Sequence, residues 1–126
     1  MKKIYPIIPV SKPRMTQADK WKKRKVTSKY WNFKDQIKAY GVILPCYQVH
    51  VTFILPMPKS WSKKQRIFNN GKPHMVKPDL DNLIKALGDA VYDNDSGIYD
   101  LWATKLWGEE GKIIIEDISQ ANQVGV

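Results

Sequence analysis

The sequence has very little cysteine and no long hydrophobic run. Cys46 is the only cysteine among 126 residues, so no disulfide can form within the chain and a reducing compartment, the cytoplasm, is expected. The apolar stretch at residues 4–10 is short and interrupted by Pro6 and Pro9, unlike a signal peptide. No stretch approaches the roughly 20 apolar residues that a membrane-spanning helix needs. We therefore expect neither a disulfide-stabilised secreted scaffold nor a membrane protein.

Acidic residues are scarce in the first 77 positions. That part holds 18 Lys and Arg but only 2 Asp and Glu, a formal charge of +16, whereas residues 78–126 hold 3 and 10, a formal charge of −7. The basic part is typical of a protein with a polyanionic partner, nucleic acid first. The acidic part would repel phosphate unless a divalent cation neutralised it. The alternative is that these acids are simply solvated surface.

Length and apolar content fit one α+β domain over residues 1–126, because a hydrophobic fraction of 43% supplies one core. Hydrophobic periodicity and turn residues predict a mixed β-sheet with helices packed on it, in the order β-α-β-α-β-β. The expected strands are residues 4–10, 47–55, 98–107 and 112–118, and the expected helices are 16–40, 62–68 (capped by Ser60) and 81–92. Prolines favour a sheet edge for the first strand. A turn at residues 108–111 predicts a hairpin of the last two.

The residues that point to chemistry begin at Asp79. If residues 78–81 are extended, Asp79 and Asp81 face one side while Leu80 faces the core, and two carboxylates at a helix start suit Mg²⁺. Lys85 lies one turn beyond Asp81, where an ammonium can stabilise a phosphate or a leaving oxygen, and Asp89 continues that flank. The alternative is structural: Asp81 caps the helix and Lys85 is its i+4 partner.

A second acidic element, with the sequence DNDS, follows at residues 93–96. This turn can fold back and supply a third carboxylate, or it is an ordinary Asx turn. Zinc is not expected, because His50 and His74 have no ligand partner at metal-binding spacing, which favours core or surface roles for both.

These motifs together resemble the RusA-type Holliday junction resolvases, which are crossover junction endodeoxyribonucleases. The resemblance rests on DLDNLIKA at residues 79–86, DA at 89–90 and the acidic turn at 93–96. SKPRMT at residues 11–16 and the basic run that follows are similar to the N-terminal block of phage-borne members. The likeness extends over most of the chain. It implies a homodimer that resolves four-way DNA junctions by paired nicks during recombination and repair, with Mg²⁺ as cofactor (Mn²⁺ able to substitute).

Carried over residue by residue, Asp79 and Asp81 match the paired metal-binding aspartates and Lys85 matches the essential lysine. Asp95 matches the second residue of the family's Asp-Asp pair, a third catalytic acid and metal ligand. Asn94 departs from that pattern, because the first aspartate of the pair is usual there. Asp93 is an alternative source of the missing charge.

The basic residues expected to contact DNA come from the N-terminal block, the connection before the acidic motif and the strand after it. They are Lys12, Arg14, Lys20, Lys22, Lys23, Arg24, Lys25, Lys63, Lys64, Arg66, Lys77 and Lys105. Two other functions remain open on sequence alone. One is a non-catalytic basic DNA-binding protein, and the other is a metal nuclease with a different branched-DNA specificity.

Overall fold

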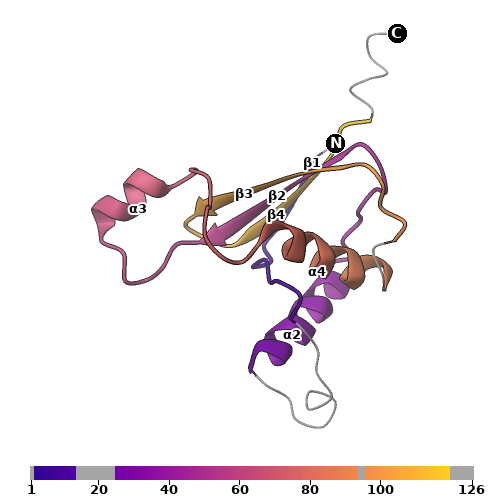
Figure 1. The fold of residues 1–126 in the computed structure, drawn as a ribbon, viewed down its shortest axis with the longest axis horizontal. Coiled ribbons are helices and arrows are strands. Elements are labelled where there is room, and N and C mark those ends of the chain that lie inside the picture. Colours follow the sequence, from indigo (N-terminus) through magenta and orange to yellow (C-terminus); the bar gives the residue numbers. More distant parts are fainter. Residues whose placement is uncertain (1, 14–24, 94–95, 120–126) are drawn as a thin grey trace.

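The fold is α+β, as the sequence predicts, with one mixed four-stranded sheet and three helices (Figure 1). A computed structural model describes residues 2–13, 25–93 and 96–119. The elements are β1 (Lys2–Tyr5), α2 (Lys25–Ala39), β2 (Val49–Pro56), α3 (Lys63–Asn69), α4 (Leu80–Tyr92), β3 (Leu101–Gly108) and β4 (Lys112–Asp117). Within these described ranges, none of the helices has the length and apolar character needed to cross a membrane.

The sheet is organised around β2. Its strand order is β1-β4-β2-β3, with β3 parallel to β2 and β4 antiparallel to it. Val49, Val51 and Phe53 alternate along β2 on the face that packs against the helices, and each is at most 1% exposed. β2 is also hydrogen-bonded along both edges, to β3 and to β4, so its backbone polar groups are paired within the sheet.

The expected hairpin of the last two strands is wrong. β3 and β4 do not pair with each other, because β2 lies between them and pairs with both. The connection at residues 109–111 crosses the end of β2, where Gly108 pairs with Pro56 and Lys112 pairs with Ile54. A Cβ at Gly108 would lie 2.3 Å from the Cγ2 of Ile54, so the glycine permits this close crossing.

Several element boundaries also differ from expectation, and β3 begins at Leu101 where a start at residue 98 was expected. The first strand is at the sheet edge as expected, but β1 ends at Tyr5 because Pro6 has no N–H to extend the ladder. Helix α3 is capped by Ser62 and not by Ser60: the Ser62 hydroxyl accepts from the Gln65 N–H, and the Gln65 side chain accepts from the Ser62 N–H. The start of the expected helix at residues 16–24 lies outside the described residues.

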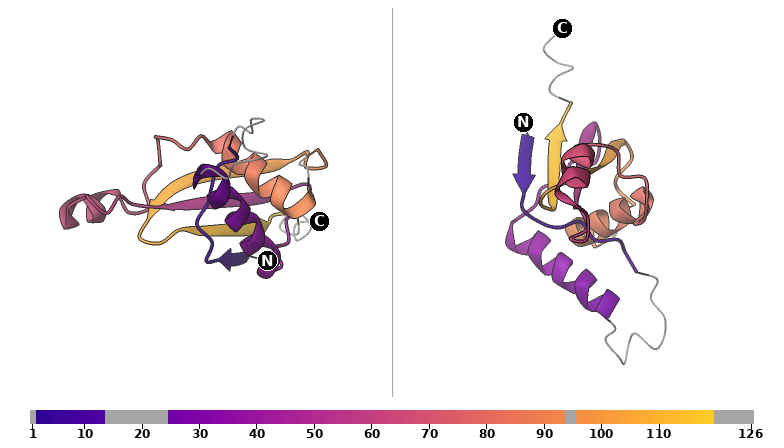
Figure 2. Two further views of the ribbon diagram at one scale, coloured as in Figure 1. Left: turned by 90° about the horizontal axis from the view of Figure 1, so that it is seen from below. Right: turned by 90° about the vertical axis from the view of Figure 1, so that its left-hand side faces the viewer.

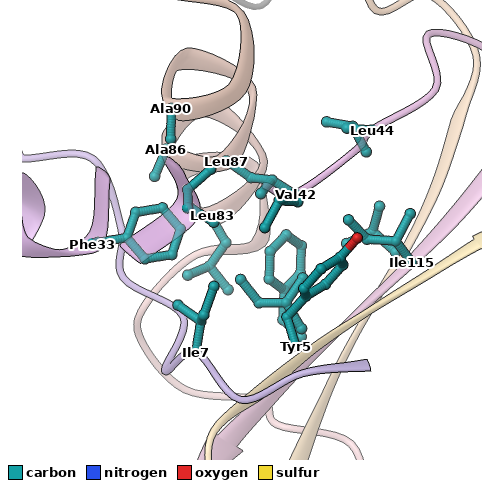
Figure 3. Close-up of a cluster of buried hydrophobic side chains, with 14 of the residues drawn as sticks. Tyr5, Ile7, Phe33, Val42, Leu44, Leu83, Ala86, Leu87, Ala90 and Ile115 are labelled. Carbon is teal, nitrogen blue, oxygen red and sulfur yellow. The ribbon is translucent and has the colours of Figure 1, made fainter. Parts of the chain in front are cut away.

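The core lies between the sheet and the helices α2 and α4, which cover the same face (Figures 1 and 2). Phe33 of α2 meets Leu83 and Leu87 of α4 there, and Ile7 from the segment after β1 fills the space beneath them (Figure 3). These four side chains are at most 1% exposed. This packing fixes the direction of α4, and with it the position of the acidic motif at its start.

Gly111→Ala is expected to destabilise the fold, because a Cβ there would lie 2.8 Å from the Cα of Ile8, a main-chain atom that cannot move aside cheaply. The loss in unfolding free energy should be about 1–3 kcal/mol, measured by urea denaturation. Gly97→Ala is the matched control, since nothing lies within 4 Å of its added Cβ. Equal stability of the two variants would contradict the close approach of Ile8.

Candidate active site

The site begins where α4 starts. Asp79 is the N-cap residue, with extended φ and ψ of −71° and 144°, and its side chain makes no capping hydrogen bond. Leu80 is already helical and packs against the core, as predicted. The expectation that residues 78–81 are all extended is wrong beyond Asp79, because Leu80 and Asp81 lie in the first helical turn. Two residues span at most about 7 Å, so both carboxylates remain within reach of one small ion.

The side chains of Asp81 and Lys85 are exposed to solvent. Among the residues that the structure describes, neither has a hydrogen bond or an ion pair, so Lys85 is not the helical partner of Asp81. The Asp79 carboxylate has one charged neighbour, the Lys77 ammonium at 3.8 Å, and that pair is too exposed to contribute much stability. The start of α4 therefore presents two carboxylates and an ammonium that the fold does not use.

The backbone before Asp79 is held by a lysine from the sheet. The Lys105 ammonium donates to the carbonyls of Val76 and Pro78, both at 2.7 Å. Sequence reasoning assigned Lys105 to DNA contact, and no local signal indicates this backbone role. The two hydrogen bonds fix the segment leading to Asp79 against β3.

Asp89 lies on the buried side of α4. Its carboxylate is paired with the Lys12 ammonium at 2.5 Å and is 6% exposed, so it does not continue the exposed flank of Lys85 as expected. The Lys12 N–H also donates to the Asn82 carbonyl at 3.2 Å. Nearby, burial raises the pKa of the Tyr30 hydroxyl, and the Asp89 charge raises it further while Lys12 opposes the change. The N-terminal segment is thus attached to the helix that carries the acidic motif.

The third acid is not placed. Asp95 and Asn94 lie outside the described residues, and the described residues contain no group of three possible metal ligands. Asp93 is the C-cap of α4, and the helix between it and Asp79 is about 20 Å long at 1.5 Å per residue. Within one chain, Asp93 is therefore far from Asp79 and Asp81.

Comparison with known families gives this arrangement an identity. The family described as Endodeoxyribonuclease RusA matches residues 5–116. The chain belongs to the RusA endodeoxyribonuclease family. The matched residues include the acidic motif, Lys85, all of β3 and most of β4.

A curated relative is similar over a shorter stretch. The chain is 35% identical over 74 residues to the uncharacterised protein YqaN of Bacillus subtilis (strain 168). That match covers 51% of this chain, and the chain spans about half, 52%, of the relative's length.

The basic residues of this RusA member fall into three groups. Arg14, Lys20, Lys22, Lys23 and Arg24 lie outside the described residues, and Lys25 begins α2. Lys63, Lys64 and Arg66 lie on α3, which belongs to a projecting segment that we call the arm (residues 58–76). The Arg66 guanidinium donates to the Pro58 carbonyl at 2.9 Å, within the arm, and to Glu109 at 3.3 Å, which joins the arm to the body. Lys77 is 90% exposed beside Asp79.

His74 lies where the arm returns to the sheet of this RusA member. It is 5% exposed, its ring centroid is 4.0 Å from that of Trp107, and its N–H donates to the Lys105 carbonyl at 3.0 Å. In the described part of the chain its buried Nδ1 has no hydrogen-bond partner. Burial lowers the pKa of this imidazole, and the Lys105 charge lowers it further.

That pKa shift makes the fold sensitive to mild acid. The unfolded state takes up the His74 proton near the ordinary pKa of about 6.5, whereas the folded state takes it up only at lower pH, so stability falls as pH drops below that value. We expect the melting temperature to fall between about pH 7.5 and pH 5.5, and His74→Phe to reduce that fall. An effect of His74→Phe on that fall no larger than the experimental scatter would contradict a role for His74.

Proposed function

We propose that the protein is a Mg²⁺-dependent endodeoxyribonuclease that resolves four-way DNA junctions as a homodimer, in recombination and repair. The observation that carries the proposal is the set of uncommitted charges at the start of α4, within a chain of the RusA family. A fold that needed these residues only for stability would use Asp79 as a capping side chain, and it does not.

The donor set fits Mg²⁺. Asp79 and Asp81 offer carboxylate oxygens, the ligands this ion prefers, and Mg²⁺ is commonly held by only one or two protein carboxylates together with substrate phosphate. Bound there, Mg²⁺ would orient the scissile phosphate and supply an activated water. Without a cation, the two carboxylates would repel the phosphate backbone from the site.

Lys85 supplies the positive charge from the protein itself. It lies one helical turn beyond Asp81, so its ammonium is on the same stretch of helix surface and unpaired among the described residues. We assign it to the negative charge that develops on the phosphate or on the leaving 3′ oxygen. Lys105 acts one step away, by holding the two carbonyls that precede Asp79.

Asp95 is the third carboxylate that the family resemblance implies. Asp95→Asn and Asp93→Asn separate it from its neighbour, because only the first should lose cleavage if the assignment is correct. Asp93→Asn should then cut normally.

A homodimer would give a two-fold symmetric junction two sites. The sheet face opposite the helices supports this, because Ile4 and Trp102 on it are 58% and 59% exposed. The Trp102 ring stacks on the His50 ring, with 3.8 Å between the ring centroids. An isologous contact through this face would cover these apolar side chains.

The decisive comparison uses three DNA substrates. A four-way junction, a linear duplex and a splayed arm are incubated with the protein, with and without Mg²⁺, and the cuts are mapped on each strand. We expect paired nicks on opposing strands of the junction, only with the metal. Equal cutting of all three substrates would indicate a nuclease of other specificity. Binding without metal-dependent cutting would indicate a non-catalytic DNA-binding protein.

A further inference from the structure

The arm carries a helix that contributes nothing to the core. α3 has seven residues and none of them is buried, and Figure 1 and the left view of Figure 2 place it apart from α2 and α4. So short a helix is not stable by itself. It is nevertheless well defined by the Ser62–Gln65 capping box and by the Asn70 N–H, which donates to the Arg66 carbonyl.

The base of the arm is fixed to the sheet. Trp107 of β3 packs against Trp61 and His74, with ring centroids 4.8 Å and 4.0 Å apart. It thereby joins the first and last segments of the arm. The last segment is hydrogen-bonded to the outer edge of β3 through the Gly71 N–H and the Lys72 carbonyl. The base of the arm is therefore fixed to the sheet, whereas the tip, which is α3, does not pack against the core.

The tip is both apolar and basic. Ile67 is 70% exposed and Phe68 is 66% exposed, and together with Lys63 and Lys64 they line a shallow groove of about 530 Å³. The Lys72 ammonium lies 3.2 Å from the centroid of the Phe68 ring, so a cation and an aromatic ring act together there. Exposed apolar side chains of this size at the end of an arm indicate a partner.

Charge identifies that partner. The arm contains five Lys and Arg and no Asp or Glu, which favours a polyanion. A second copy of the chain is disfavoured, because two such tips would repel each other. In intact duplex DNA, contact of Ile67 and Phe68 with base faces would require base pairs to unstack, whereas the phosphates need only cations. DNA with unstacked bases uses both kinds of side chain.

We propose that the tip of the arm inserts Ile67 and Phe68 between unstacked bases at the branch point of a DNA junction, with Lys63, Lys64 and Lys72 on the flanking phosphates. This rests on the proposed function and adds the element that distinguishes branched DNA from duplex. Ile67 and Phe68 would bind only where bases are unstacked, whereas the three lysines would attract the phosphates of any DNA. Arg66 is a positioning residue, because its bonds hold the arm and leave the tip to the other side chains.

The test uses a four-way junction with 2-aminopurine at the branch point, in EDTA so that cutting does not interfere. Wild-type protein should raise the fluorescence, because the probe base leaves its stack. Ile67→Ser/Phe68→Ser should lose most of that rise and bind the junction on the order of tenfold more weakly, with duplex binding unchanged. Folding should persist, because neither side chain is buried.

Two further variants separate the roles. Tyr40→Ser/Ile43→Ser removes an equally exposed aromatic and isoleucine elsewhere, 51% and 62% exposed, and should behave as wild type. Lys63→Ala/Lys64→Ala should weaken junction and duplex binding together and lower the salt slope by about two.

The outcomes are distinguishable. If wild-type protein binds the junction no better than duplex, the proposed function and this inference both fail. If wild type prefers the junction but the Ile67→Ser/Phe68→Ser variant shows the same fluorescence and the same preference, only the arm inference is overturned. Binding to poly-glutamate is measured as well. If the Ile67→Ser/Phe68→Ser variant binds the junction like wild type but loses wild-type binding to poly-glutamate, the tip would be assigned to an acidic protein, and the arm inference would also be overturned.

Discussion

Asp79→Asn and Asp81→Asn should each reduce single-turnover cleavage of a four-way junction on the order of 10³-fold or more. Each change keeps the size of the side chain but removes a charged oxygen ligand for the metal. Junction binding should persist or strengthen, because a negative charge near phosphate is lost. Both side chains are free of hydrogen bonds within the described residues, so stability should not fall.

The control for this pair is chosen from exposed aspartates elsewhere. Asp35→Asn and Asp100→Asn make the same chemical change at exposed positions outside α4. Both should cut at the wild-type rate. Cleavage near the wild-type rate by either Asp79→Asn or Asp81→Asn in Mg²⁺ would remove that residue from the active site.

Lys85→Ala is expected to fold, dimerise and bind junctions, yet cut them on the order of 10²-fold more slowly. As a surface partner of Asp81 it would contribute only about 0.3–0.5 kcal/mol to stability and nothing to catalysis. The structure lacks that ion pair among its described residues, which leaves the ammonium available to the phosphate. A single-turnover rate with saturating protein measures the step directly.

Lys85→Arg tests whether position matters as well as charge. Arginine replaces a compact ammonium by a broad planar group, so rescue should be poor if the ammonium meets one particular oxygen. Lys29→Ala, an exposed lysine on α2, is the matched control and should cut normally. Normal cleavage by Lys85→Ala would return this residue to the helix surface and leave the aspartates to act alone.

The sequence predicts α4 well but not the direction of every face. Its apolar period places Leu83 and Leu87 in the core, as observed. The same helix geometry puts Asp89 on the flank of Lys85, and the structure buries it instead. The reason is Lys12, which lies 77 residues away in the chain and provides the charge that makes burial tolerable. A pairing over that distance leaves no local signal.

Strand pairing was harder to predict than strand position. The glycines at 108 and 111 indicate a tight turn, and there is one, but the two strands it joins do not pair. The decision depends on β2, whose regular burial of Val49, Val51 and Phe53 makes it the central strand. Turn residues report on neighbours along the chain, whereas strand order depends on which strand buries most.

For the candidate site, the sequence selects the residues but not their bonding. The spacing of Asp79, Asp81 and Lys85 predicts a metal-dependent chemistry, and that assignment stays a prediction. That the Asp79 carboxylate is left out of the helix cap, and that Lys105 holds the carbonyls before it, can be read only from the fold. These two features separate a prepared site from an ordinary helix start.

Divalent metal binding by the protein alone tests the central claim, that Asp79 and Asp81 hold a divalent metal ion at the start of α4. Mn²⁺ is titrated into the protein without DNA, and the free ion is followed by electron paramagnetic resonance. Wild-type protein and the Asp35→Asn/Asp100→Asn variant should bind Mn²⁺ saturably, and added Mg²⁺ should displace the bound Mn²⁺. Asp79→Asn/Asp81→Asn should not bind it. Equal Mn²⁺ binding by all three proteins, or no binding by wild type, would contradict metal binding by Asp79 and Asp81.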